Sequence, residues 1–267
     1  VVGVLCCRHA IRLAKENGIG VVTARHVNHF GAAAWWAQQI AASGCIGIVL
    51  CNAPPRVPTW QGREPRVGTN PICMALPTRE GKKSWLLDMA TTTVAFGKLF
   101  VEASKGRETI PHGWCMDREG RPTTSLADGM KGFLMPLGGY KGSGLAFMVE
   151  ILCSVLSGGA LFGEIGSIRS YGKPMRASQF YLAIEVERFM PLEEFTDRVD
   201  RTVDWIKSAQ PAAGYDEVLA AGEPEWRMEE YRRANGIPLP PAVWKELEEA
   251  ANRLGVEVPQ PDSGGGR

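Results

Sequence analysis

The stretch that decides the fold is Leu134–Glu150, LMPLGGYKGSGLAFMVE. It has glycines at positions 138, 139, 142 and 144, with Tyr140 and Lys141 between them. Apolar residues then recur every three or four positions from Leu145 to Leu156, which predicts a helix. Glycines allow tight turns and the close approach of a ligand, and the amides that open a helix favour an anion. The stretch therefore predicts a strand-to-helix turn, and both a solvated glycine turn and a phosphate site fit these residues.

The composition is that of a globular protein with little net charge. Of the 267 residues, 45% are hydrophobic and 22% are charged, and the net charge of +1 argues against a nucleic-acid partner. The seven cysteines form no CxxC pair and lie mostly in apolar runs, which predicts reduced thiols in the cytoplasm rather than disulfides or zinc. No apolar run reaches membrane-spanning length. The sequence begins without Met, and a fragment is one interpretation.

The flanking segments predict an α/β protein. A helix at 4–17, a strand at 19–24, a helix from His29 to about Ser43 capped by Asn28, and a strand at 45–51 form a strand–helix–strand pattern. The run from Asn52 to Asn70 is rich in proline and glycine and predicts a long irregular loop, which is usually functional. Further strands are predicted at 72–76, 85–89 and 180–186, helices at 94–104, 192–208, 224–234 and 241–254, a hairpin or loop at 112–125, an irregular stretch at 157–173 and a disordered tail at 259–267.

Two residues are candidates for acid–base chemistry. His29 is expected in the first turn of a helix, whose positive end would keep the ring neutral. A neutral ring near a carbonyl suits a reductase, although a capping or hydrogen-bonded core histidine is the commoner role. Asp88 ends a strand just before a predicted helix. An aspartate there commonly caps the helix, and it can also orient a histidine or stabilise its charged form.

Several motifs occur in a fixed order along the chain. They are His29-Phe-Gly-Ala, Gly68-Thr-Asn-Pro71, Leu87-Asp-Met-Ala-Thr91 with Gly97-Lys98, Pro111-x-Gly-Trp114, Pro136-Leu-Gly-Gly-Tyr-Lys-Gly142, Met148-Val-Glu-Ile-Leu152, Leu156-Ser-Gly158 and Gly222-Glu-Pro-Glu225. Together they resemble the malate/L-lactate dehydrogenase family, which also holds sulfolactate and ureidoglycolate dehydrogenases and 2,3-diketogulonate and piperideine-carboxylate reductases. The resemblance extends from about Gly3 to Val256.

The resemblance implies an α/β fold that is not a Rossmann fold, with a mixed sheet flanked by helices as in sulfolactate dehydrogenase. The absence of a GxGxxG motif is then expected. Residues 25–214 would form the nicotinamide-cofactor domain. Residues 1–24 and 215–267 would form a terminal domain for substrate and dimer contacts, and the protein would work as a cytoplasmic homodimer.

The resemblance also implies the site and the reaction. The implied cofactor contacts are Asn28, His29, Phe30, Gly31, Ala32, Asn52, Thr78, Arg79, Tyr140, Lys141, Gly222, Glu223 and Pro224. His29 and Asp88 are the implied catalytic residues, and no metal is implied. The reaction would be hydride transfer between NAD or NADP and a small 2-hydroxy or 2-oxo acid similar to malate or lactate. Basic residues near Arg79 leave NAD and NADP both open.

Two alternatives compete with this interpretation. Relatives carry a segment ahead of the position of Val1 that supplies a Ser-His pair and an arginine, and neither occurs in this sequence. The first alternative is therefore a non-catalytic or truncated relative that keeps the fold and the cofactor site. The second is a phosphate-ester transferase that uses Lys141, but its metal would need a carboxylate cluster, and no such spacing is found.

Overall fold

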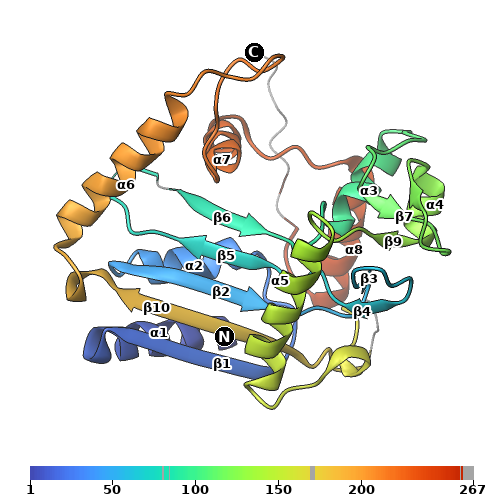
Figure 1. Cartoon of the computed structure of the whole chain (residues 1–267). Coiled ribbons are helices and arrows are strands. Elements are labelled where there is room, and N and C mark those ends of the chain that lie inside the picture. The colour runs from blue at the N-terminus through green and yellow to red at the C-terminus, as the bar shows by residue number, and fades with distance from the viewer. Residues whose placement is uncertain (80, 84, 169–171, 259, 261–267) are drawn as a thin grey trace. The chain divides into compact units, whose positions relative to one another are not determined.

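The structure is a computed structural model that describes residues 1–79, 81–83, 85–168, 172–258 and 260 (Figure 1). The chain forms two compact units, Val1–Glu223 and Pro224–Arg267. The tail predicted to be disordered at 259–267 lies outside the described residues, except for residue 260.

The first unit is built on a five-stranded sheet in the order β1-β10-β2-β5-β6. The strands are β1 (Ile19–Val27), β10 (Ala177–Glu185), β2 (Cys45–Cys51), β5 (Ile72–Ala75) and β6 (Leu86–Met89). Every neighbouring pair is antiparallel, and Leu182 in β10 pairs with Val21 and with Ile48. The strands β1 and β2 are therefore parallel, as a strand–helix–strand unit requires, but β10 lies between them.

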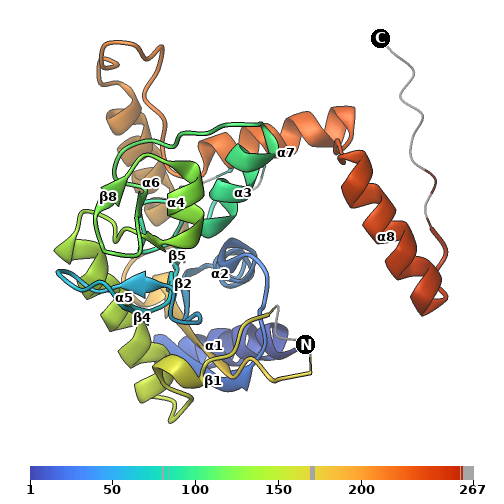
Figure 2. The same cartoon turned by 90° about the vertical axis from the view of Figure 1, so that its right-hand side faces the viewer.

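Helices cover both faces of this sheet (Figures 1 and 2). One face carries α1 (Val2–Asn17) and α2 (Ala33–Ala41), and the other carries α5 (Tyr140–Glu150) and the π-helix Ile151–Val155. Gly47 lets α2 approach β2 closely, because a Cβ there would lie 2.6 Å from the carbonyl oxygen of Ala37. On the opposite face, Leu50, Val149, Cys153 and Phe180 form a buried apolar cluster.

Short strands and helices form a second core beside the sheet. The strands β3 (Val57–Pro58) and β4 (Pro65–Val67) pair with each other, and β8 (Pro122–Thr123), β7 (Cys115–Met116) and β9 (Phe133–Leu134) form a three-stranded sheet. Together with α3 (Phe96–Ser104) and α4 (Leu126–Lys131) they enclose buried Leu99 and Leu134. The predicted irregular run 52–70 thus contains a two-stranded ribbon, and the hairpin predicted within 112–125 is confirmed by β7 and β8.

The remaining elements are mostly helical. The 3-10 helices Phe162–Glu164 and Val186–Arg188 precede α6 (Leu192–Lys207), α7 (Glu223–Asn235) and α8 (Pro241–Leu254). No helix in the described part of the chain is long and apolar enough to cross a membrane. The α/β class with a sheet flanked by helices is confirmed. The expected mixed sheet was wrong for the described strands, because all four neighbouring pairs are antiparallel.

Two predicted helix boundaries were wrong. The helix expected from His29 begins at Ala33, and Ala32 rather than Asn28 is its N-cap residue. The helix expected after Gly144 already begins at Tyr140. Gly138 and Gly139 make the turn, with left-handed φ values of +57° and +66°, whereas Gly142 and Gly144 lie inside the helix.

Candidate active site

Residues from distant parts of the chain, some of them predicted site residues, lie at one end of the five-stranded sheet. Because neighbouring strands run in opposite directions, β1, β2 and β6 end where β5 and β10 begin. We call this the site end of the sheet. Asn28 follows β1, Asn52 follows β2, Asn70 precedes β5 and Thr91 follows β6. The opposite end, at Ala75 and Leu86, is called the far end.

The turn from Asn28 to Ala32 is anchored to the sheet. The side-chain oxygen of Asn28 accepts the N–H of Met175 at 3.4 Å, and its carbonyl oxygen accepts from Gln179 at 3.2 Å. The Phe30 ring stacks on Trp36 with ring centroids 6.2 Å apart and meets Tyr181 edge-on at 6.5 Å. These contacts fix the turn while His29 is exposed to solvent.

His29 has a defined tautomer in its neutral form. Its Nδ1 atom accepts the N–H of Gly31 at 3.0 Å. A neutral ring that accepts at Nδ1 carries its proton on Nε2, so it offers one outward donor. The expectation that His29 lies in the first helical turn was wrong, because the helix begins at Ala33.

Asp88 caps a helix, but not the helix that follows it. One of its carboxylate oxygens accepts the N–H of Ala34 at 2.8 Å, in the first turn of α2. A carboxylate is stabilising at this end because the free amides there carry partial positive charge. The prediction that Asp88 caps the next helix was wrong. The contact instead ties β6 to the helix that follows the His29 turn.

The glycine turn presents the N-terminus of α5 at the site end. Tyr140 and Lys141 are the first two residues of this 11-residue helix, and both are exposed. The free N–H groups of the first turn and the ammonium of Lys141 together suit an anion. The turn is joined to β6 because Leu137 donates to the Thr91 oxygen at 3.0 Å and Gly142 donates to the Leu137 oxygen at 2.7 Å.

The loop from Asn52 to Asn70 forms a wall beside this helix end. The Trp60 ring meets Tyr140 edge-on with centroids 6.4 Å apart, and the Trp60 N–H donates to Ser143 at 3.0 Å. Sequence reasoning did not single out Trp60, although a lone tryptophan in a proline- and glycine-rich run was the available signal.

Asn52 lies behind the site end rather than on its surface. It is only 1% exposed, and its side-chain amide donates to Glu150 at 3.2 Å and to Ser154 at 2.5 Å. Its side-chain oxygen accepts the N–H of Ser178 at 2.8 Å. Sequence reasoning also assigned no role to Glu150, although this residue lies in the Met148–Leu152 motif, because an ordinary helical position gives no sign of its partners.

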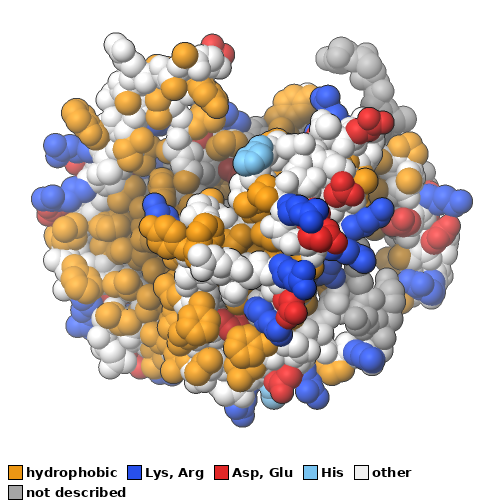
Figure 3. Space-filling model, turned by 45° about the vertical axis from the view of Figure 1, so that its right-hand side comes forward, with side chains coloured by type: hydrophobic (Ala, Val, Ile, Leu, Met, Phe, Trp, Pro, Cys, Tyr) orange, Lys and Arg blue, Asp and Glu red, His pale blue; other side chains and the backbone are white. Residues whose placement is uncertain are grey.

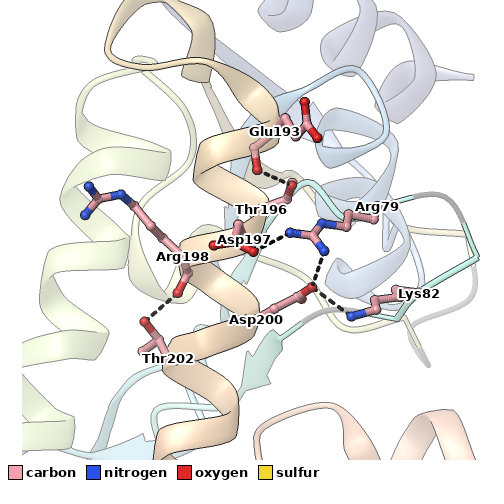
Figure 4. Close-up of polar contacts among 8 residues, drawn as sticks. All are labelled: Arg79, Lys82, Glu193, Thr196, Asp197, Arg198, Asp200 and Thr202. Atoms are coloured by element: carbon pink, nitrogen blue, oxygen red, sulfur yellow. Dashed lines mark hydrogen bonds and ion pairs between the residues drawn. The ribbon is translucent and has the colours of Figure 1, made fainter.

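Thr78 and Arg79 lie at the far end of the sheet, because they follow the last residue of β5. The Arg79 guanidinium is 2.7 Å from Asp197 and 3.8 Å from Asp200, and Lys82 is 2.9 Å from Asp200 (Figure 4). Both carboxylates belong to α6. The turn is thus paired with acidic groups, and the length of β5 separates it from Tyr140 and Lys141.

The segment around Gly222 also runs along the far end. Leu86, the first residue of β6, donates to the Ala221 oxygen at 3.1 Å. Glu223 accepts the N–H of Ala220 at 2.9 Å and pairs with Lys207. Pro224 begins the second compact unit. The predicted contacts of the first unit therefore form two groups, one at each end of the sheet.

No group of three or more His, Cys, Asp or Glu able to hold a metal ion occurs among the residues that the structure describes. The phosphate-ester transferase alternative therefore gains no support from this structure, because such an enzyme would need a carboxylate-bound metal.

Comparison with known proteins identifies the family. Residues 1–248 match the family profile described as malate/L-lactate dehydrogenase. The malate dehydrogenase of Pyrococcus horikoshii is 40% identical over 265 residues, which cover 96% of this chain and 72% of that protein. The ureidoglycolate dehydrogenase (NAD(+)) of Escherichia coli K12 is 31% identical over 246 residues, which cover 90% and 68%.

A solved structure confirms the fold. The sulfolactate dehydrogenase of Methanocaldococcus jannaschii has a TM-score of 0.87 and 35% identity, covering 96% of this chain and 73% of that one. The resemblance noted in the sequence and the expected sulfolactate-dehydrogenase-like fold are both confirmed. The chain belongs to the malate/L-lactate dehydrogenase family.

Proposed function

We propose that this chain is an NAD(P)-dependent oxidoreductase that transfers a hydride between the nicotinamide and a small 2-hydroxy or 2-oxo acid, similar to malate or lactate. One observation carries the proposal: the exposed His29 turn and the Lys141 helix end both lie at the site end of the sheet. The names of two relatives, malate dehydrogenase and ureidoglycolate dehydrogenase (NAD(+)), support the reaction type and the cofactor class.

The residues at the site end fit an anionic dinucleotide. The free amides of α5 and the Lys141 ammonium bind its phosphates, and the backbone turn at Gly138 and Gly139 leaves room for close approach. The turn 28–32, with Phe30 anchored beneath it, lies against the nicotinamide. In this proposal Asn52 supports the same end from behind, and Tyr140 lines it.

The second group of contacts receives the other end of the dinucleotide. Thr78, Arg79, Gly222 and Glu223 contact the adenosine half. Arg79 is already paired with Asp197 and Asp200, and carboxylates near a ribose accept its 2′-hydroxyl but repel a 2′-phosphate. We therefore expect NAD to bind more tightly than NADP.

The chemistry divides between cofactor and protein. The bound nicotinamide supplies or accepts the hydride at C4. His29 donates from Nε2 to the substrate oxygen, because its Nδ1 is engaged by Gly31. Asp88 fixes the start of α2 through Ala34 and so holds the segment that follows His29.

The same proposal covers assembly and compartment. Residues 25–214 carry the cofactor, and residues 1–24 and 215–267 form the terminal domain of a homodimer. Phe147, Ile151 and Val155 are 53%, 41% and 57% exposed on α5 and the π-helix, and Figure 3 shows hydrophobic side chains gathered on one face. Such patches mark protein contacts. All seven cysteines are free, which supports a reducing compartment such as the cytoplasm.

The deciding experiment is a titration with NADH and NADPH followed by fluorescence, and then oxidation of each by a panel of 2-oxo acids. Binding with turnover supports the proposal and identifies the substrate. Binding without turnover favours the alternative of a non-catalytic relative that keeps the cofactor site. If neither cofactor binds, the proposal is refuted.

A further inference from the structure

Glu150 is a buried carboxylate whose described partners are neutral amides. It is the last residue of α5, stands immediately before the π-helix and is 2% exposed. One of its oxygens accepts from the side-chain amide of Asn52 at 3.2 Å, and the other accepts from Asn70 at 3.1 Å. Burial raises the pKa of Glu150, and the bonds from the two asparagines and the backbone of Phe162 oppose this increase.

The two asparagines are the two ends of the loop 52–70. Each is also tied to its surroundings: Asn70 accepts the N–H of Ala53 at 3.0 Å and donates to the Ala146 oxygen in α5 at 2.8 Å. Asn70 has a left-handed φ of +30°, a region in which asparagine is enriched. The Glu150 carboxylate therefore closes the loop at its base and holds it against α5.

Two residues of the loop 52–70, Trp60 and Thr69, connect its closure by Glu150 to the site end of the sheet. Trp60 packs against Tyr140, next to Lys141. The Thr69 oxygen accepts both the N–H and the hydroxyl of Thr91, at 2.9 and 3.0 Å. A loop released at its base would displace Trp60 and loosen the end of β6.

A carboxylate is needed because two amide donors face one side chain. Glutamate accepts at both oxygens, whereas glutamine offers one acceptor and one NH₂ group. With glutamine, one asparagine donor would face another donor and go unpaired, and an unpaired buried group costs far more than a typical hydrogen bond contributes. Burying a charge also costs free energy. A glutamine would fill the same space without this cost, but it could not accept from both asparagines.

We propose that Glu150 is a positioning residue for the cofactor site: it closes the 52–70 loop against α5 and thereby sets the affinity for the nicotinamide dinucleotide. The second half of this inference rests on the proposed function, whereas loop closure does not.

The test is Glu150→Gln with Glu185→Gln as its matched control. Glu185 is the last residue of β10, is 3% exposed and pairs with Lys15 at 2.6 Å, at the end of the strand away from the site end. Three quantities are measured in the full chain: the Kd for NADH, kcat at saturating NADH, and hydrogen exchange of residues 53–70 without cofactor.

For Glu150→Gln we expect the Kd for NADH to rise about tenfold, the size that corresponds to one unpaired buried donor. Exchange of residues 53–70 should become faster, while kcat at saturation changes by less than about twofold. Glu185→Gln should lower stability but leave both the Kd and the exchange of this loop unchanged. Should Glu150→Gln not fold, Glu150→Asp, which keeps both oxygens but shortens the reach, should give smaller changes in the same direction.

Unchanged affinity in Glu150→Gln, with a wild type that binds NADH, would overturn the inference. Equal weakening of NADH binding by both variants would overturn it too, because a general loss of stability would then suffice. If the wild type binds neither cofactor, the proposed function and the affinity half of this inference fail together. Loop exchange then decides closure alone: faster exchange supports it, and unchanged exchange refutes it.

Discussion

Replacing Gly142 by alanine tests whether the start of α5 is locked to β6. A Cβ at Gly142 would lie 2.4 Å from the Leu137 nitrogen, 2.5 Å from the Thr91 oxygen and 2.6 Å from the Leu137 oxygen. All three atoms are backbone, so no side chain can rotate away. Gly144 provides the matched control, because it lies in the same helix and a Cβ there meets nothing within 4 Å.

The magnitudes follow from these contacts. In an exposed helix interior, alanine is more favourable than glycine by about 1 kcal/mol, so Gly144→Ala should raise the free energy of unfolding by up to that amount. Gly142→Ala has the same local gain but must displace backbone, and overpacking costs about 1–3 kcal/mol. Displacing Leu137 also weakens its bonds to Thr91 and Gly142, each contributing about 1 kcal/mol. The expected net effect is a loss of about 2–4 kcal/mol.

Urea denaturation followed by circular dichroism gives the free energy of unfolding of both variants. A parallel NADH titration should show weaker binding for Gly142→Ala, because the turn before Tyr140 moves, and near-normal binding for Gly144→Ala. If Gly142→Ala is as stable as Gly144→Ala, the helix start is not held by the Thr91–Leu137 contact, and the reasoning is refuted.

Lys141→Ala should raise the Kd for NADH but change the free energy of unfolding by no more than about 0.5 kcal/mol relative to the wild type, because the side chain is exposed. Lys131→Ala on α4 is the control. Unchanged NADH affinity in Lys141→Ala would contradict the assignment of Lys141 to the cofactor phosphates. Asp88→Asn should lower the free energy of unfolding by up to about 1 kcal/mol, because it removes the negative charge that caps α2. It should also lower kcat more than cofactor affinity. Normal kinetics with lower stability would show that Asp88 has only a structural role as a helix cap. Asp197→Ala should remove the nearer of the two carboxylates that pair with Arg79 and so raise NADPH affinity relative to NADH. A constant ratio of the two affinities in paired titrations would contradict the expected NAD preference. Burial is the largest single influence on the pKa of Glu185 and acts to raise it, but the hydrogen bonds from Lys15 and Cys45 and the charge of Lys15 together outweigh burial, and the pKa is lowered. The stability that the carboxylate contributes is therefore complete above the unfolded-state pKa of about 4.3 and is lost as pH falls through the folded-state pKa. The difference in free energy of unfolding between the wild type and Glu185→Gln should therefore shrink in acid, and denaturation curves that keep it constant would contradict this assignment.

Local patterns in the sequence were enough for most individual elements. The strand Cys45–Cys51 and the helix Pro241–Leu254 have the predicted bounds, because side-chain periodicity within one element depends on neighbours a few residues away. The order of the motifs was enough to indicate the family, which the comparisons confirm. The glycine turn and the exposed Lys141 next to it were also evident from the sequence.

Only the tertiary structure decided which of these pieces meet. Asp88 caps a helix 54 residues earlier in the chain, and Arg79 pairs with Asp197, 118 residues away. Glu150 joins Asn52 and Asn70, which are 98 and 80 residues distant, and the sequence marks none of these bonds. Periodicity reports the environment of one element at a time. The partners of a polar side chain depend on strand order and register, and here β10 enters between β1 and β2 and sets both.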